Sequence, residues 1–269
     1  MALPEPRPGF GEKKVLDIIT NAEFYIKSYG ADKLIASTVQ TLKEYLNFNN
    51  KAGQNLSTPF YITIKKFIEN NQIENGIGGT KIVDKKQILD AINIDFEKFV
   101  KNRNSVRDFS SEPVTKDEVI KAVDLAKYAP SVCNRQGWHV HFYENKDKIK
   151  QLLSLQNGNR GFTDSINKLI IITGDTKSFT KYEANQIFVD GGLFAMNLIL
   201  SLHSLGIGSI ALNTDIPYVI EKQMKKNGNI PEHERLIMYL GIGKLKDQYR
   251  VAISNRKDTQ QILTIHEEA

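Results

Sequence analysis

At residues 103–109 the chain reads Arg-Asn-Ser-Val-Arg-Asp-Phe, and at residues 129–136 it reads Ala-Pro-Ser-Val-Cys-Asn-Arg-Gln. The first stretch carries two guanidinium groups and a hydroxyl within five residues. Such a set can bind a phosphate, because the planar fork of arginine donates two parallel hydrogen bonds. The second stretch offers uncharged side chains that donate and accept hydrogen bonds, as the edge of a heteroaromatic ring requires: Ser131, Asn134 and Gln136.

A short helix is predicted between these stretches. Thr115 and Glu118 have the spacing of a capping box, and apolar residues recur after them at helical spacing. Pro130 should stop the helix, because the residue before a proline is pushed out of the helical region. We therefore expect one rigid element to hold the two stretches at a fixed separation.

Strands and helices alternate after Gln136, which favours a sheet sandwiched by helices. The helix at 187–205 is long and apolar, and Gly206 should stop it. The predicted strands are Trp138–Tyr143, Leu169–Thr173, Ser209–Leu212, Arg235–Leu240 and Arg250–Ile253, and the predicted helices are Asp147–Leu155, Ile187–Leu205 and Pro217–Lys226.

The first hundred residues read as all-α, with no catalytic constellation. A glycine-rich connector is expected over 75–80, where the chain reads Asn-Gly-Ile-Gly-Gly-Thr. We predict two domains, a helical N-terminal extension over 1–91 and a main domain over 92–269. The expected helices are Lys13–Tyr29, Asp32 to about Leu46, Thr58–Asn70, and one from Asp84 or Lys85 to Lys101.

The motif pair R-x-S-V-R-x-F and A-P-S-x-x-N-x-Q resembles the nitroreductase family of FMN-dependent oxidoreductases. The likeness covers roughly residues 92 to 269. It implies an α+β fold, a three-layer α/β/α sandwich, in a homodimer with FMN between the subunits. The apolar helix Ile187–Leu205 would then supply much of the dimer core.

The same resemblance implies the residues of an FMN site. Arg103, Ser105 and Arg256 would hold the phosphate, and Arg107 would lie near the N1–C2=O edge of the flavin. It names no catalytic acid or base and no metal ligand, and the chain departs from many relatives in carrying Gly137 after the glutamine. The full expected set is Arg103, Asn104, Ser105, Arg107, Pro130, Ser131, Asn134, Gln136, Asn159, Asn213, Thr214 and Arg256.

The implied activity is hydride transfer from NADH or NADPH through flavin N5 to an organic acceptor such as a nitro compound or a quinone. Two alternatives stay open. One is a flavin enzyme of another reaction type, such as a dehalogenase, a ring oxidase or a flavin-destroying enzyme. The other is a non-enzymatic flavin-binding or assembly protein whose residues 1–91 dock a protein partner.

Composition argues against several other classes. The formal charge is +5 without a block of like charge, so no nucleic-acid partner is expected. The single cysteine, Cys133, suits a reducing cytoplasm. The first residues lack the apolar core of a signal peptide. No run of about 18 apolar residues is present, so no membrane span is expected.

Two further patterns are interpreted as structural. Residues 206–211 spell G-x-G-x-x-A, but this stretch follows a predicted helix and opens a strand, the reverse of a dinucleotide-binding turn. His139 and His141 point to one face of a predicted strand, and no third metal ligand is placed near them in the sequence. We therefore expect these histidines to have a structural or surface role.

Overall fold

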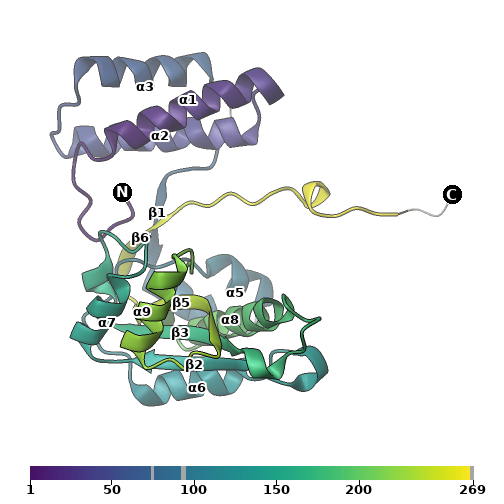
Figure 1. Ribbon diagram of the computed structural model, residues 1–269. Helices are drawn as coiled ribbons and strands as arrows, with labels where there is room; N and C mark the ends of the chain where they lie inside the picture. The colour runs from purple at the N-terminus through teal and green to yellow at the C-terminus, as the bar shows by residue number, and fades with distance from the viewer. Residues whose placement is uncertain (74–75, 92–94, 267–269) are drawn as a thin grey trace. The chain divides into compact units, whose positions relative to one another are not determined.

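The computed structural model describes residues 1–73, 76–91 and 95–266, and the chain forms two compact units (Figure 1). The first comprises Met1–Ala2, Pro6–Lys81 and Ala252–Ala269; the second comprises Leu3–Glu5 and Ile82–Val251. The division after Lys81 precedes the boundary that we expected after residue 91. The C-terminal segment, which we expected in the main domain, groups with the first unit.

The first unit is built on α1 (Glu12–Tyr29), α2 (Lys33–Lys51) and α3 (Thr58–Asn70). Gly30, at φ 82°, follows the end of α1, and the side chain of Asp32 caps α2 by accepting from the backbone N–H of Leu34 at 2.9 Å. These helices lie where the sequence predicted them, although α2 extends beyond Leu46. Their apolar faces meet in one core: Val15, Ile19, Ile35, Val39, Leu42, Ile64 and Phe67.

Two expectations for the first hundred residues are wrong. The region is not all-α, because β1 (Thr80–Asp84) pairs with β6 (Gln248–Ala252) in a two-stranded sheet. The helix expected up to Lys101 is two helices, α4 (Lys85–Ala91) and α5 (Phe96–Asn102). Asp95 has an extended backbone and caps α5, accepting from the N–H of Lys98 at 3.1 Å. Residues 92–94 and part of the expected connector lie outside the described residues.

The second unit contains an antiparallel sheet in the order β2-β3-β5-β4. The strands are β2 (Trp138–Tyr143), β3 (Lys168–Asp175), β4 (Ile207–Leu212) and β5 (Glu234–Lys244). The central strand β3 is buried on both faces, as its continuous apolar run predicted. β5 extends past Leu240, where the predicted strand ended: Gly241 and Gly243 lie inside the strand and pair with β4.

Helices cover both faces of this sheet, which gives the expected three layers of an α+β fold (Figure 1). Alternate residues of β3 enter different cores. Ile170 and Ile172 pack with α6 (Lys116–Ala126) and α8 (Gln186–Ser204), whereas Leu169 and Ile171 pack with α7 (Lys146–Leu153) and α9 (Tyr218–Gly228). The capping box predicted at Thr115 and Glu118 is present.

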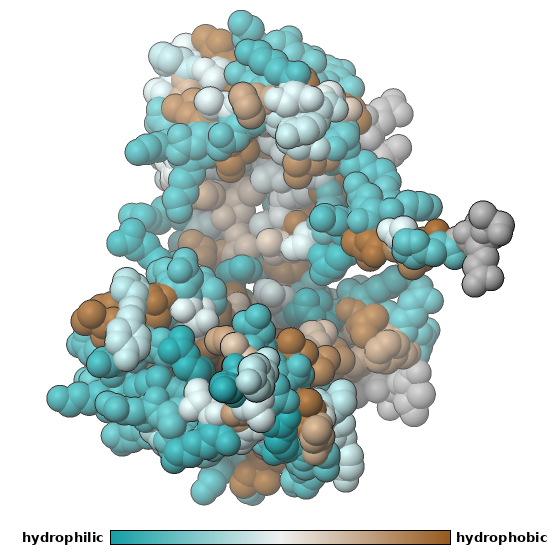
Figure 2. Space-filling model, turned by 45° about the vertical axis from the view of Figure 1, so that its right-hand side comes forward, coloured by the Kyte–Doolittle hydropathy of each residue, from teal (hydrophilic) through white to brown (hydrophobic). Residues whose placement is uncertain are grey.

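The apolar character of α8 is largely explained by the core. Contrary to our expectation, α8 is long and apolar enough to cross a membrane by length and composition. However, 56% of its apolar window is buried inside the structure, against α6 and the sheet. A core helix satisfies the same criterion. On the face drawn in Figure 2, hydrophilic residues dominate the surface, and hydrophobic residues form small groups among them.

Candidate functional site

The stretch 103–109 is seated on the sheet by its two apolar residues. Val106 and Phe109 are buried, at 2% and 4% exposure. The backbone N–H of Val106 donates to the carbonyl of Ser209 at 3.0 Å, and Ser105 forms a bridge to the same residue. Because the apolar side chains enter the core, the polar residues between them are held at a defined place beside β4.

Two glycines make room for this stretch. Gly208 of β4 lies directly opposite Gly243 of β5. A Cβ atom on Gly243 would lie 2.6 Å from the ring of Phe109, and one on Gly208 would lie 3.2 Å from Phe109 and from Val106. Close packing of the arginine stretch therefore accounts for Gly208 in the G-x-G spelling at 206–208, and Gly206, at φ 70°, follows the end of α8.

Arg107 is a half-buried cation. Its carbonyl accepts a hydrogen bond from Ser165 Oγ at 2.6 Å, and its guanidinium carbon lies 5.8 Å from the centre of the Phe162 ring. Burial lowers the pKa of Arg107. Over the ranges 1–73, 76–91 and 95–266 no carboxylate forms an ion pair with it. A desolvated cation without a protein counter-charge is suited to an anionic ligand.

Arg103 follows the end of α5 and lines a small hollow with Asn104, His203 and Ser209. The amide of Asn104 donates to the carbonyl of Asn102 at 2.7 Å. Burial lowers the pKa of His203, and the nearby guanidinium of Arg103 adds to this effect. Asn104 and Ser105 are half-buried like Arg103, so this part of the stretch is neither sealed in the core nor fully exposed.

The stretch 129–136 forms a tight turn in which three residues other than glycine have positive φ. The φ angles are 49° at Cys133, 53° at Asn134 and 51° at Gln136. Ser131 Oγ accepts from the N–H of Gln136 at 3.0 Å and closes the turn. The side chains of Asn134 and Gln136 are exposed and lie together, with Gln136 Nε2 3.3 Å from Asn134 Oδ1. Left-handed conformations of this kind cluster at binding sites.

Two anchors for this turn were missed in the sequence. Asp190, buried in α8, accepts from the backbone N–H of Val132 at 3.1 Å and from Gln186 Nε2 at 2.7 Å. Arg135 forms a two-pronged ion pair with Glu183, with one N–O distance of 2.9 Å. This pair lowers the pKa of Glu183 to about 2. A single carboxylate inside an apolar helix was the available signal for Asp190.

Three further residues of the expected site, Asn159, Asn213 and Thr214, lie together at the end of β4. Asn159 is buried, and its amide donates to the carbonyls of Leu153 and Gln156 at 2.8 and 2.7 Å. These bonds within its own loop occupy the donors that we expected to reach the flavin. Asn213 is exposed, Thr214 is half-buried, and the carbonyl of Asn213 accepts from Gln156 Nε2 at 3.1 Å.

Two expected residues stand apart from these groups. Arg256 is exposed in the C-terminal segment of the first unit, and its guanidinium donates to the carbonyl of Ser254 at 2.9 Å. Pro130 is exposed and does not end α6, which stops at Ala126 with Lys127 as its C-cap. The second unit thus contains the whole expected site except Arg256.

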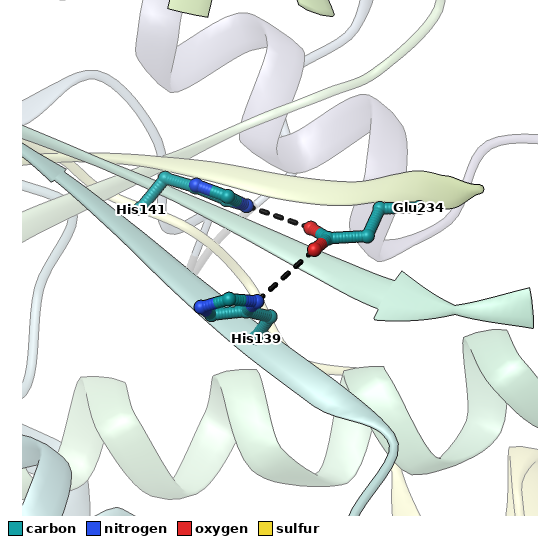
Figure 3. Close-up of side chains that lie close together, drawn as sticks. All are labelled: His139, His141 and Glu234. Carbon is teal, nitrogen blue, oxygen red and sulfur yellow. Dashed lines mark hydrogen bonds and ion pairs between the residues drawn. The ribbon is translucent and has the colours of Figure 1, made fainter. Parts of the chain in front are cut away.

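The two histidines of β2 meet a third polar residue that sequence spacing did not indicate. Glu234, at the start of β5, approaches both rings (Figure 3). Burial raises the pKa of Glu234, but hydrogen bonds from Thr173 and His141 outweigh it, and the pKa lies below its ordinary value. No local signal connected these residues, because Glu234 follows His139 by 95 positions.

Comparison with known proteins agrees with this architecture. A model of the nitroreductase family matches residues 100–158. The chain is 34% identical over 112 residues to the CLA biosynthesis enone reductase of Lactiplantibacillus plantarum, covering 39% of this chain and 51% of that protein. The chain therefore spans about half the length of this relative. A protein of Archaeoglobus fulgidus, provisionally named NADH dehydrogenase/NAD(P)H nitroreductase, is 25% identical over 154 residues, covering 56% of this chain and 86% of its own.

Solved structures share the fold of the second unit. A nitroreductase family protein of Streptococcus pneumoniae superposes with a TM-score of 0.55 at 20% identity, over 64% of this chain and 100% of its own. A nitroreductase-like protein of Streptococcus mutans gives 0.55 at 23% identity, over 64% and 98%. The second unit therefore has the nitroreductase fold. With the match to the family model over residues 100–158, this confirms the resemblance to the nitroreductase family.

Proposed function

We propose that the protein is an FMN-dependent oxidoreductase that passes hydride from NADH or NADPH to a small organic acceptor. The family match, the fold and the names of the relatives support an oxidoreductase. The observation that carries the proposal is the half-buried guanidinium of Arg107, which has no carboxylate partner over the described residues. An anionic, partly apolar ligand such as FMN meets the requirements of this position.

The residues present fit this cofactor. Arg103 and Ser105 would bind its phosphate. The turn 131–136 would present Asn134 and Gln136 to the ring edge, and Asn213 and Thr214 would flank its reactive side. When bound, FMN would supply the chemistry of hydride transfer from the nicotinamide to the acceptor. Arg107 would stabilise the negative charge that reduction places at the N1–C2=O edge.

The acceptor is proposed to carry a polarised multiple bond. Nitro compounds and quinones are the first candidates, because the A. fulgidus relative is named a nitroreductase. An α,β-unsaturated ketone is a second candidate, because the relative at 34% identity is named an enone reductase. All three acceptors take hydride at an electron-poor atom, so the same flavin can serve each of them.

We also propose a homodimer. One face of α8 is exposed and apolar although the rest of the helix is buried. This α8 stripe consists of Phe188, Val189, Leu193 and Met196, whose exposures lie between 45% and 51%. A second copy of the chain would cover it. We place the protein in the cytoplasm and assign the three-helix unit to contact with a protein partner; both remain proposals.

Anaerobic turnover tests the activity. NADH and NADPH oxidation is followed at 340 nm with a nitroaromatic compound, a quinone and an enone in turn. We expect continuous oxidation with at least one acceptor and, without an acceptor, oxidation of no more than about one nicotinamide per bound flavin. Flavin-loaded protein that oxidises neither nicotinamide with any acceptor would favour the alternative of a flavin-binding or assembly protein.

A further inference from the structure

Three ligand-type side chains converge on one face of the sheet. His139 and His141 are separated by one residue in β2, so both side chains project toward the same face of the sheet, the one that α7 and α9 cover. Glu234 begins β5, and its carboxylate reaches across β3 to both rings (Figure 3). His139 Nδ1 lies 3.0 Å from Glu234 Oε1, and His141 Nε2 lies 2.7 Å from Glu234 Oε2.

The separations are close to those of ligands that share one ion. The three donor atoms lie within 4.8 Å of one another. Zinc binds nitrogen and oxygen at about 2.0–2.2 Å, so tetrahedral donors stand about 3.3 Å apart. Small shifts of the side chains would open enough space for a metal between the rings and the carboxylate.

The surroundings of the Glu234 carboxylate suit a metal ligand. The Glu234 side chain is 3% exposed, and Thr173 Oγ1 donates a hydrogen bond to its Oε2. Such a bond from outside the ligand set is typical of metal sites, where it orients the ligand. A buried carboxylate is also costly unless it is paired with positive charge, which a bound metal ion would supply.

We infer that His139, His141 and Glu234 form a binding site for a divalent transition-metal ion of the zinc type. Two imidazoles with one carboxylate suit zinc, iron, nickel or copper, whereas magnesium and calcium prefer oxygen ligands alone. Three protein ligands leave at least one coordination position for water. The side chain of His139 is 59% exposed, so solvent reaches the site from its side.

The ion would take the place of two hydrogens. In the metal-free protein each facing ring nitrogen shares a hydrogen with the carboxylate. On binding, that hydrogen moves to the other ring nitrogen, or to solvent if the ring was protonated. The bound ion would link β2 to the start of β5 across the central strand. None of these three residues belongs to the set assigned to FMN, so this site stands independently of the proposed function.

Equilibrium dialysis of the full-length protein tests the site. The protein is stripped with a chelator, dialysed against micromolar zinc chloride, and analysed for zinc per chain, with far-UV circular dichroism to verify folding. We expect one zinc per chain and a melting temperature that rises with zinc. His139→Ala removes an exposed ligand without opening the core and should weaken zinc affinity at least tenfold. Glu234→Gln should do the same.

His233→Asn is the matched control. His233 is the neighbour of Glu234 in sequence, but its ring faces Asp175, at 3.8 Å. This variant should keep the zinc stoichiometry and the zinc-dependent rise in melting temperature. The inference is overturned if the wild type retains no zinc at micromolar concentration, if folded His139→Ala binds zinc as tightly as the wild type, or if His233→Asn loses zinc to the same extent.

Discussion

The carboxylate of Asp190 accepts a hydrogen bond from the backbone N–H of Val132 at 3.1 Å, which ties the turn 131–136 to the buried helix α8. The other oxygen of Asp190 accepts from Gln186, so both sides of the carboxylate are occupied. The turn contains three residues at positive φ. The buried carboxylate of Asp190 therefore fastens this strained backbone to the core.

Replacing this anchor should weaken flavin binding. Asp190→Asn keeps the size of the side chain but removes the charge and one acceptor. Hydrogen bonds to charged groups contribute about 1.5–3 kcal/mol. Because the lost hydrogen bond holds the turn that would contact the flavin, we expect FMN to bind roughly 10- to 100-fold more weakly. Fluorescence titration of the flavin-free protein measures this. Asp117→Asn, at an exposed carboxylate in α6, is the control, and equal affinities in the two variants would refute the anchoring role.

The two arginines of the first stretch should have separable effects. In the proposed complex, reduction of FMN would add negative charge near Arg107, whereas the phosphate near Arg103 would have the same charge in both redox states. Arg107→Ala should therefore lower the midpoint potential. For about 1–3 kcal/mol the expected shift is roughly 20–60 mV in a two-electron couple. Arg103→Ala should weaken FMN binding with little change in potential. Photoreduction titrations with excess FMN measure the midpoint potential of each variant. Equal shifts in both variants would contradict the separate roles assigned to the two arginines.

The α8 stripe should mediate dimerisation. A charge placed among its apolar side chains would be desolvated in the dimer but solvated in the monomer. We expect Leu193→Arg to shift sedimentation velocity profiles from dimer to monomer and to lower the flavin content. Val219→Arg changes an apolar residue of α9 that is 73% exposed, and it should leave the profile unchanged. A Leu193→Arg protein that stays dimeric would place the interface elsewhere.

The unit boundary makes a prediction about truncation. Val83 and Ile88 are buried in the core of the second unit, at 4% and 1% exposure. We therefore expect a chain starting at residue 82 to keep a stable flavin-binding unit. A chain starting at residue 92 should lose about 3–6 kcal/mol, from two buried side chains at about 1.5–3 kcal/mol each. Urea denaturation compares the free energies of unfolding of the two truncated chains. Equal values would support the domain boundary after residue 91 that was inferred from the sequence.

Much of the fold followed from local signals. The capping box at Thr115 and Glu118, the end of the first helix at Tyr29 and the strand over Leu169–Thr173 each depend on residues close in sequence, and each was confirmed. The errors have local causes as well. Asp95 was taken as a helix-interior residue when it is an N-cap, and β1 was missed because only one of its five residues, Val83, is buried.

The site was less predictable, because its supporting contacts are long-range. Asp190 meets Val132 across 58 positions, and Glu234 meets His141 across 93. Family resemblance supplied the residues that we expect to face a ligand but not the carboxylates that contact their neighbours in the chain. Asn159 stays a predicted flavin contact, and its amide donates hydrogen bonds to the carbonyls of Leu153 and Gln156.

The central claim is that this chain binds FMN, and the cofactor released from the purified protein tests it most directly. The protein is denatured, and the supernatant is analysed by chromatography and mass spectrometry beside its visible spectrum. We expect a yellow protein that releases FMN, about one per chain, and no FAD, because Arg103 and Ser105 are the proposed phosphate ligands and Gly208 of the G-x-G spelling is explained by packing. A colourless protein that cannot be loaded with FMN would contradict the account.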